Sequence, residues 1–396
     1  MRITPGSRVS LSLFAALAMA SNAWGVDPTP YQQTNLVSDL PGVAKLQDPL
    51  LKNPWGISLS PSGGAFWVSN NHTGTTTLYQ GDVNSSPFVQ VPALPSVTIP
   101  GAGGNPSSPT GQVFNGGSNL VITDGTNSKP ALFLFASEDG TVGAWNPSVG
   151  SPTPPSTTAK VPIDQSSGGA SYTGIALANN GASSTVYLAN NGTGKIDTFD
   201  GSFNPVTLSG SFVDPNLPAD VKPFNVENIN GTLYVTYVHD ESAANADEGG
   251  VVDRFDLNGQ FLGRLETDGP LNRPWGLAMA PSDFGTFSNA LLVGDEGDGR
   301  ISAFDPVTGQ FLGQISDSSG QAIQIDELWG ITFGNGVTAG DKNALYFASG
   351  LNDEENGLFG SIRVVPETNS LLLVAFSIPA ILVAYIRRRK VAHAAS

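Results

Sequence analysis

Three short segments share one pattern that decides the fold: NPWGI at residues 53–57, RPWGL at 273–277 and LWGI at 328–331. Related segments begin at residues 109, 172 and 223. One small residue marks each copy, namely Gly56, Gly111, Gly174, Asn225, Gly276 and Gly330. Neighbouring markers are separated by about fifty to sixty residues, which is the length of one blade in a β-propeller.

The rest of each repeat also has the pattern of strands. Residues 185–189 (TVYLA) are rich in β-formers, residues 190–194 (NNGTG) are a polar turn, and residues 195–200 (KIDTFD) alternate between apolar and polar. Such alternation, bounded by Asn, Asp and Gly, indicates hairpins. Residues 310–315 (QFLGQI) supply a fourth strand after one such hairpin. We therefore predict four antiparallel strands in each repeat.

The repeats predict an all-β domain, a six-bladed β-propeller over residues 26–365. The last repeat has no obvious fourth strand after residues 357–364, and an N-terminal strand at residues 31–37 (YQQTNLV) belongs to no repeat. We expect these two strands to pair and to close the ring. Residues 92–109 and 147–162 are rich in Pro, Gly, Ser and Thr, and we expect surface loops there.

Charge and cysteine content exclude several kinds of function. The chain of 396 residues has a formal net charge of −16, and all its acidic residues lie between Asp27 and Glu367. An acidic surface repels phosphate backbones, so we expect no nucleic-acid partner and instead a cation, a basic protein or a polysaccharide. The chain has no cysteine, which excludes disulfides, thiolate catalysis and Cys-ligated metals.

The two ends have the pattern of targeting segments. Residues 1–25 combine Arg2 and Arg8 with an apolar stretch at 9–20 and small residues near Gly25, as in a secretory signal peptide; an uncleaved anchor is the alternative. Residues 371–386 are apolar and are followed at once by basic residues, which predicts a transmembrane helix with a cytoplasmic end. A buried core helix is the alternative there.

The C-terminal tail, residues 366–396, resembles the PEP-CTERM sorting signal of Gram-negative bacteria. The resemblance rests on a short motif, an apolar helix and a basic cluster: Val365, Pro366 and Glu367, then residues 371–386, then Arg387, Arg388, Arg389 and Lys390. Thr368 stands where that motif has a second proline. The resemblance implies export to the cell envelope, an inner-membrane helix, an exosortase-type sorting enzyme as partner, and release to the surface after processing.

The repeats resemble the six-bladed propellers that include NHL repeats and the SMP-30/gluconolactonase enzymes. With its tail, the chain is similar to a conserved group of PEP-CTERM-bearing propellers without an assigned activity. The SMP-30 group implies a Ca²⁺-dependent hydrolase or lactonase that acts at the mouth of the central channel. Its ligand pattern of a Glu, two Asn and an Asp has Asn190, Asn352 and Asp295 as the nearest candidates in this chain.

Polar turns are expected to surround one mouth of the channel. In a propeller, the inner strand of each blade begins at the face where the second and third strands are joined. The turns in question are residues 70–74, 138–140, 190–194, 239–241, 295–299 and 352–355. Hard oxygen ligands favour Ca²⁺ or Mg²⁺ over softer metals, and the candidates are Asn190, Asp240, Asp295, Glu327 and Asn352. The alternative is that these residues only form turns.

Other candidates for chemistry are few. His72 and His239 lie on similarly placed turns and would face each other across the mouth as an acid–base pair or metal ligands, or have no role. Trp55, Trp275 and Trp329 are either a sugar-stacking ring or core. Nucleophile-elbow, P-loop, dinucleotide-binding and zinc-protease motifs are absent. The leading interpretation is an exported binding or structural module, with the hydrolase as the alternative.

Overall fold

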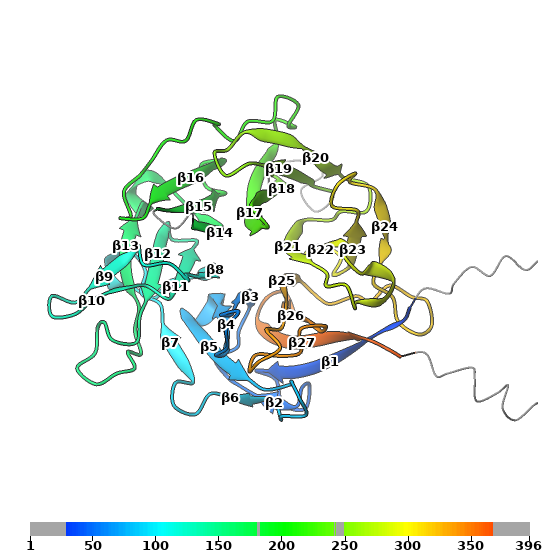
Figure 1. Ribbon diagram of the computed structural model, residues 1–396, viewed down its shortest axis with the longest axis horizontal. Coiled ribbons are helices and arrows are strands. Elements are labelled where there is room, and N and C mark those ends of the chain that lie inside the picture. Colours follow the sequence, from blue (N-terminus) through cyan, green and yellow to red (C-terminus); the bar gives the residue numbers. More distant parts are fainter. Residues whose placement is uncertain (1–28, 180–182, 241, 243–248, 367–396) are drawn as a thin grey trace, which may run out of the picture.

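The computed structural model describes residues 29–179, 183–240, 242 and 249–366. Six sheets, in which almost all neighbouring strands are antiparallel, are arranged as blades around a common centre (Figure 1). The innermost strand of each blade carries one marker residue of the repeat, and the next strands along the chain lie further out; in the last blade the N-terminal strands are outermost. The prediction of a six-bladed β-propeller is confirmed.

The strands of the first three blades are as follows. Blade one contains β3 (Pro54–Ser58), β4 (Phe66–Asn70), β5 (Thr75–Gln80), β6 (Val89–Gln90) and β7 (Ser96–Thr98). Blade two contains β8 (Pro109–Phe114), β11 (Phe133–Ser137), β12 (Thr141–Trp145) and β13 (Lys160–Asp164), with the added hairpin β9 (Val121–Thr123) and β10 (Ser128–Pro130). Blade three contains β14 (Tyr172–Asn179), β15 (Ser184–Asn190) and β16 (Lys195–Asp200).

The other three blades continue in the same order around the ring. Blade four contains β17 (Val221–Ile229), β18 (Thr232–His239), β19 (Val251–Phe255) and β20 (Phe261–Thr267). Blade five contains β21 (Pro274–Met279), β22 (Leu291–Asp295), β23 (Ile301–Phe304) and β24 (Phe311–Gln314). Blade six contains β25 (Leu328–Phe333), β26 (Leu345–Leu351), β27 (Asn356–Val364), β1 (Tyr31–Ser38) and β2 (Leu46–Gln47). Short 3₁₀ helices lie at Asn71–Thr73, Ala102–Gly104, Ser166–Gly168 and Gly285–Phe287.

The glycine markers of the repeat lie where neighbouring inner strands approach most closely. A Cβ on Gly330 would lie 2.5 Å from the carbonyl oxygen of Trp55, and a Cβ on Gly56 would lie 2.5 Å from that of Thr110. Both distances are shorter than real Cβ atoms tolerate. In blade four the marker is Asn225, whose Nδ2 donates to the carbonyl oxygen of Trp275 at 2.8 Å. The repeat is therefore a steric requirement of the ring.

The ring is closed by the pairing of the two ends of the described chain. Strand β1 pairs antiparallel with β27, from Tyr31 opposite Val364 to Ser38 opposite Leu358. The ring of Tyr31 is buried, and its hydroxyl donates to the carbonyl oxygen of Phe284 at 2.8 Å in the next blade. The predicted pairing of the N-terminal strand with the last blade is confirmed.

Two details differ from the sequence-based prediction. Blade three has three strands, because residues 201–220 contain Pro205, Pro215 and Pro218, which have no N–H to extend a ladder. The segment 92–109 is also more than a surface loop. Val97 and Ile99 within it are fully buried and pack with Trp67 and Phe135 between blades one and two.

Both predicted targeting segments lie outside the described residues: the signal peptide at residues 1–25 and the transmembrane helix at residues 371–386. Within the described part of the chain, no helix has the length and hydropathy needed to cross a membrane.

Candidate functional site

The centre of the propeller is filled by aromatic side chains from four inner strands. Trp55 of blade one lies against Phe224 of blade four, with ring centroids 6.3 Å apart, although these blades are opposite each other in the ring. Trp275 contacts Trp55 and Trp329 edge-on, at 6.0 Å in each case. All four rings are buried. They form an aromatic plug across the channel, and this burial supports the core interpretation of the three tryptophans.

A pocket of about 360 Å³ lies at the mouth of the channel next to this plug. Trp55, Phe224 and Trp329 contribute its aromatic part. The other side chains that line it are polar or charged, apart from Val238: Glu138, Ser171, Thr173, Asn191, Lys222, His239, Asp240, Arg273 and Glu354. An apolar base with polar groups converging from several blades is the usual composition of a small-ligand site. We call this cavity the mouth pocket.

The residue two positions before each tryptophan has an uncommon backbone conformation. Asn53, Arg273 and Glu327 have φ angles of 44°, 54° and 45°. Side chains other than glycine rarely adopt positive φ, and such conformations often occur at functional sites. Arg273 lines the mouth pocket, and its guanidinium lies 5.6 Å from the centroid of Phe224. The repeat thus places an amide, a guanidinium and a carboxylate at equivalent positions, each two residues before a tryptophan of the plug.

The charges in the mouth pocket are partly paired. Lys222 forms an ion pair with Asp240 at 2.6 Å, and Arg273 pairs with Glu296. The hydrogen bond from Lys222 lowers the pKa of Asp240. Glu138 accepts a hydrogen bond from Asn71 at 2.8 Å. Acidic groups exceed basic ones, so the pocket disfavours anions.

Two glutamates at the junction of blades six and one have raised pKa values. Burial, with the negative charges of Glu354, Glu296 and Asp326, raises the pKa of Glu327 to about 7. Burial and then the charge of Glu296 raise the pKa of Glu354, which accepts a hydrogen bond from Asn53 Nδ2 at 2.7 Å. Both carboxyl groups therefore keep their protons to a higher pH than ordinary surface carboxyl groups do.

Two buried oxygens at this junction have no hydrogen-bond partner within the described part of the chain: Asn53 Oδ1 and Glu327 Oε2. Both lie close to Gly350, because a Cβ on that residue would be 2.8 Å from Glu327 Oε2 and 3.0 Å from Asn53 Oδ1. A buried acceptor without a partner is unfavourable, and it is satisfied when its own carboxyl group carries a proton or when a donor lies beside it.

A second cavity, of about 780 Å³, lies between blades five and six and is also lined by Glu327. It shares Arg273 with the mouth pocket and is otherwise lined by Glu296, Asp298, Asp326, Glu327 and neighbouring residues. The acidic surface of this face therefore extends beyond the mouth pocket.

The two histidines are not similar in their surroundings. His72 is exposed, and its Nε2 lies 3.5 Å from Asn53 Nδ2. His239 is buried and lines the mouth pocket, with Nδ1 3.0 Å from Asp220 and Nε2 3.5 Å from Asp268. The two imidazole rings thus contact different residues, and each ring contacts residues near its own turn. The predicted acid–base pair stays a prediction.

Two candidate calcium ligands, Asn190 and Asp295, are the last residues of the second strands of their blades. Asn190 Oδ1 accepts hydrogen bonds from the backbone of Ser171 and Thr193, both at 3.1 Å. Asp295 Oδ1 accepts from the backbone of Asn272 at 3.1 Å in the equivalent place of blade five. Burial raises the pKa of Asp295 well above its usual range. Both side chains thus connect a strand end to the preceding loop.

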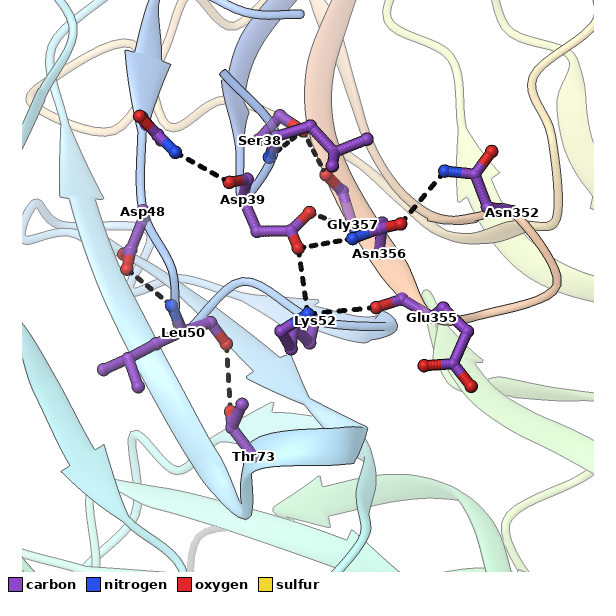
Figure 2. Close-up of polar contacts among 12 residues, drawn as sticks. Ser38, Asp39, Asp48, Leu50, Lys52, Thr73, Asn352, Glu355, Asn356 and Gly357 are labelled. Carbon is purple, nitrogen blue, oxygen red and sulfur yellow. Dashed lines mark hydrogen bonds and ion pairs between the residues drawn. The ribbon is translucent and has the colours of Figure 1, made fainter.

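The candidate Asn352 belongs to a polar cluster at the closure of the ring (Figure 2). Asn352 Nδ2 donates to Asn356 Oδ1 at 3.0 Å, and Asn356 Nδ2 donates to Asp39 Oδ2 at 2.7 Å. Asp39 also accepts from Lys52 Nζ at 3.1 Å and from the backbone of Gly357 at 2.9 Å. This cluster connects β27 with the segments on either side of β2.

The five predicted calcium ligands are spread over blades three to six, and Asn190, Asp240, Asp295 and Asn352 each hydrogen-bond a different protein group. Among the residues described, no group of three or more His, Asp or Glu side chains is arranged to hold a metal ion. The calcium site stays a prediction.

The sorting motif is only partly described. Val365 donates its backbone N–H to the carbonyl oxygen of Pro30 at 2.8 Å, and Pro366 follows it. Glu367, Arg387, Arg388 and Arg389 lie outside the described residues.

Phe224, Arg273, Glu138 and Glu354 were not among the predicted site residues. Phe224 is at the repeat position of the tryptophans, and Arg273 is at that of Asn53 and Glu327, so the repeat itself carried a signal for both. The polar turns that contain Glu138 and Glu354 were recognised, but which turn side chains point into the mouth depends on the geometry of the closed ring.

The fold and the filled channel define a six-bladed β-propeller with a small pocket at one mouth. Two relatives come from Acanthamoeba polyphaga mimivirus. Uncharacterized protein R648 is 33% identical over 344 residues, which cover 84% of this chain and 80% of the relative. Uncharacterized protein L690 is 33% identical over 337 residues, covering 83% and 84%. The chain belongs to the family of these proteins.

Solved structures with a similar fold are more distant. A streptogramin B lyase has a TM-score of 0.46 and 12% identity, covering 85% of this chain and 98% of the other. An α-L-arabinofuranosidase of Fusarium graminearum has a TM-score of 0.49 and 10% identity, covering 84% and 98%. Likeness at this level carries no argument about activity. No known family model matches the chain.

Proposed function

We propose that this protein is a binding module that takes a saccharide in the mouth pocket. One observation carries the proposal: the pocket of about 360 Å³ is lined by Trp55, Phe224 and Trp329 together with carboxylate, amide and ammonium groups. Carboxylates and amides hydrogen-bond hydroxyl groups, and aromatic surface accepts the apolar face of a sugar ring. The excess of acidic groups favours neutral or amine-bearing sugars over acidic ones.

We also propose that the module is exported and held at the cell envelope. The signal-like residues 1–25 and the apolar residues 371–386 with their basic flank support this proposal. A sorting enzyme of the exosortase type is the partner that the resemblance of the tail implies. In this arrangement the propeller presents its pocket to extracellular polysaccharide.

The test is binding of oligosaccharides to the full chain, measured by calorimetry or on an immobilised glycan panel. Glu354→Gln and Glu138→Gln keep the size of each side chain but remove its charge, and we expect each to weaken binding about tenfold, or about 1.4 kcal/mol. Asp283→Asn, at an exposed position of blade five, is the matched control and should bind as the natural protein does. Binding that is absent, or that is unaffected by the mouth variants, contradicts the proposal.

A further inference from the structure

The outer edge of blades four and five exposes large apolar side chains. Val307 is 78% exposed, Leu262 55%, Leu312 46% and Phe311 41%. Phe311 and Leu312 lie side by side on β24, the outermost strand of its sheet. Exposed apolar edge strands are normally avoided, because they pair or aggregate unless something covers them. We therefore expect a partner to cover this edge.

Arg254 connects the outer strands of the two blades that carry these side chains. Arg254 pairs with Gly263 in the register of β19 and β20, next to Leu262. Its Nη1 donates to the carbonyl oxygen of Val307 at 3.1 Å. Val307 lies in the turn that leads directly to Phe311. We call Leu262, Val307, Phe311 and Leu312 the rim patch.

Both ends of the described chain leave the propeller close to the end of β24, the strand that carries Phe311 and Leu312. Tyr31 donates its backbone N–H to the carbonyl oxygen of Ser316, just beyond β24, at 2.8 Å. Val365 donates to Pro30 at 2.8 Å, so the C-terminal end lies beside the N-terminal one. Figure 1 shows both ends leaving at the edge where β24 lies.

The distance from this exit to the apolar segment is short. Residue 371 follows Pro366 by five residues, which span at most about 18 Å when extended. A bilayer that holds residues 371–386 therefore lies within that reach of the exit. An apolar patch at such an exit is suited to the interface of the bilayer, where apolar side chains enter the boundary between headgroups and acyl chains.

We propose that the rim patch rests on the lipid bilayer in which residues 371–386 anchor the chain. The inference rests on the proposed anchoring at the envelope. It adds an orientation, because the propeller lies with the edge of blades four and five on the membrane. The axis of the channel then runs along the bilayer surface, and the mouth pocket opens sideways, free of lipid.

The test uses the absence of cysteine in the chain, so that single cysteines can be labelled. Leu312→Cys and Val121→Cys in the full chain each receive an environment-sensitive fluorophore, and the protein is reconstituted in phosphatidylcholine vesicles that contain a spin-labelled lipid. Val121, on the hairpin of blade two, is 50% exposed and so matches Leu312 at 46%. We expect several-fold stronger quenching at position 312 than at position 121.

Each other outcome overturns the proposal in a distinguishable way. If the full chain does not float with the vesicles, the anchoring itself fails. If it floats but positions 312 and 121 are quenched equally, the anchoring stands and the orientation is wrong. If label 312 is shielded without lipid quenching, a second copy of the chain covers the patch instead. Val307→Cys provides a second labelling site, and Phe311→Ser with Leu312→Ser should reduce its quenching while flotation is kept.

Discussion

The indole rings of Trp55 and Trp329 stack with their centroids 3.5 Å apart and 13° between their planes. Trp55 begins blade one and Trp329 begins blade six, so this contact lies where the ring closes. The neighbouring backbones are equally close, because Gly330 faces the carbonyl oxygen of Trp55. Side chains and backbone thus support the closure together, and the mouth pocket lies directly beside it.

Truncation of the plug should destabilise the whole propeller. Trp329 is 1% exposed and contacts three other aromatic rings, so Trp329→Ala leaves a large cavity. We expect a loss of about 3–5 kcal/mol in the free energy of unfolding, measured by denaturant titration. Leu312→Ala, on the exposed rim, should cost less than about 0.5 kcal/mol. A loss at Trp329 as small as that at Leu312 would show that the plug does not stabilise the ring.

The marker glycines should not tolerate even one added methyl group. In Gly330→Ala, the new Cβ would meet the carbonyl oxygen of Trp55 at 2.5 Å, and both strands belong to the rigid inner ring. We expect a loss of about 1–3 kcal/mol from the displaced backbone. The control is Gly168→Ala, where nothing lies within 4 Å of the new atom. Equal melting temperatures of the two variants would contradict the steric interpretation of the repeat.

The polar cluster around Asp39 should contribute strongly to the stability of the closed ring. Asp39 is buried and accepts hydrogen bonds from Lys52, Asn356 and Gly357. Asp39→Ala leaves these donors without their partner, and we expect a loss of about 2–3 kcal/mol. Asp283→Ala, at an exposed site, should be nearly neutral. Thermal unfolding of both variants measures the difference, and a neutral Asp39→Ala would mean that β1 and β27 close the ring without this cluster.

The architecture of this protein could be predicted because it is repeated locally. Each glycine marker reports one close approach of inner strands, and the six markers give the number of blades. The strand at residues 31–37 had no repeat of its own, and this made its pairing with the last blade predictable. Physical constraints that recur along the chain leave a pattern in the sequence.

The parts that could not be predicted depend on contacts across the ring. Arg273 lies over Phe224, and Trp275 donates to the carbonyl oxygen of Thr173 at 3.1 Å, about a hundred residues away in the sequence. No local spacing encodes such contacts. The missing fourth strand of blade three could have been inferred from Pro205, Pro215 and Pro218, but the turns before them look like those of the other blades.

Removal of metal should not change the stability of the protein. The oxygens of Asn190 and Asn352 are candidates for Ca²⁺, but the two side chains hold other protein groups, and Asp240 pairs with Lys222. We expect the same melting temperature in EDTA and in millimolar Ca²⁺. A ligand present at a hundredfold excess over its Kd would add about 2.7 kcal/mol. A clear rise with Ca²⁺ would contradict our expectation and support the calcium-dependent hydrolase.

Glu327 should make the protein less stable as pH rises toward neutrality. Its pKa is about 7 in the folded protein and 4.5 for an unperturbed side chain. Between these values the folded state binds more protons than the unfolded state, so the free energy of unfolding falls as pH rises and then levels off above about pH 7. In its protonated form, Glu327 places no charge on the buried Oε2, which has no hydrogen-bond partner within the described part of the chain.

The variant Glu327→Gln carries a permanent amide donor and no charge. We expect its free energy of unfolding to fall less than that of the natural protein between pH 4.5 and pH 7. Some dependence on pH should remain, because burial raises the pKa of Asp253 to about 7 as well. Asp283→Asn is the control and should keep the full slope. If Glu327→Gln shows the same fall as the natural protein, Glu327 is ionised throughout this range, and other groups cause the dependence on pH.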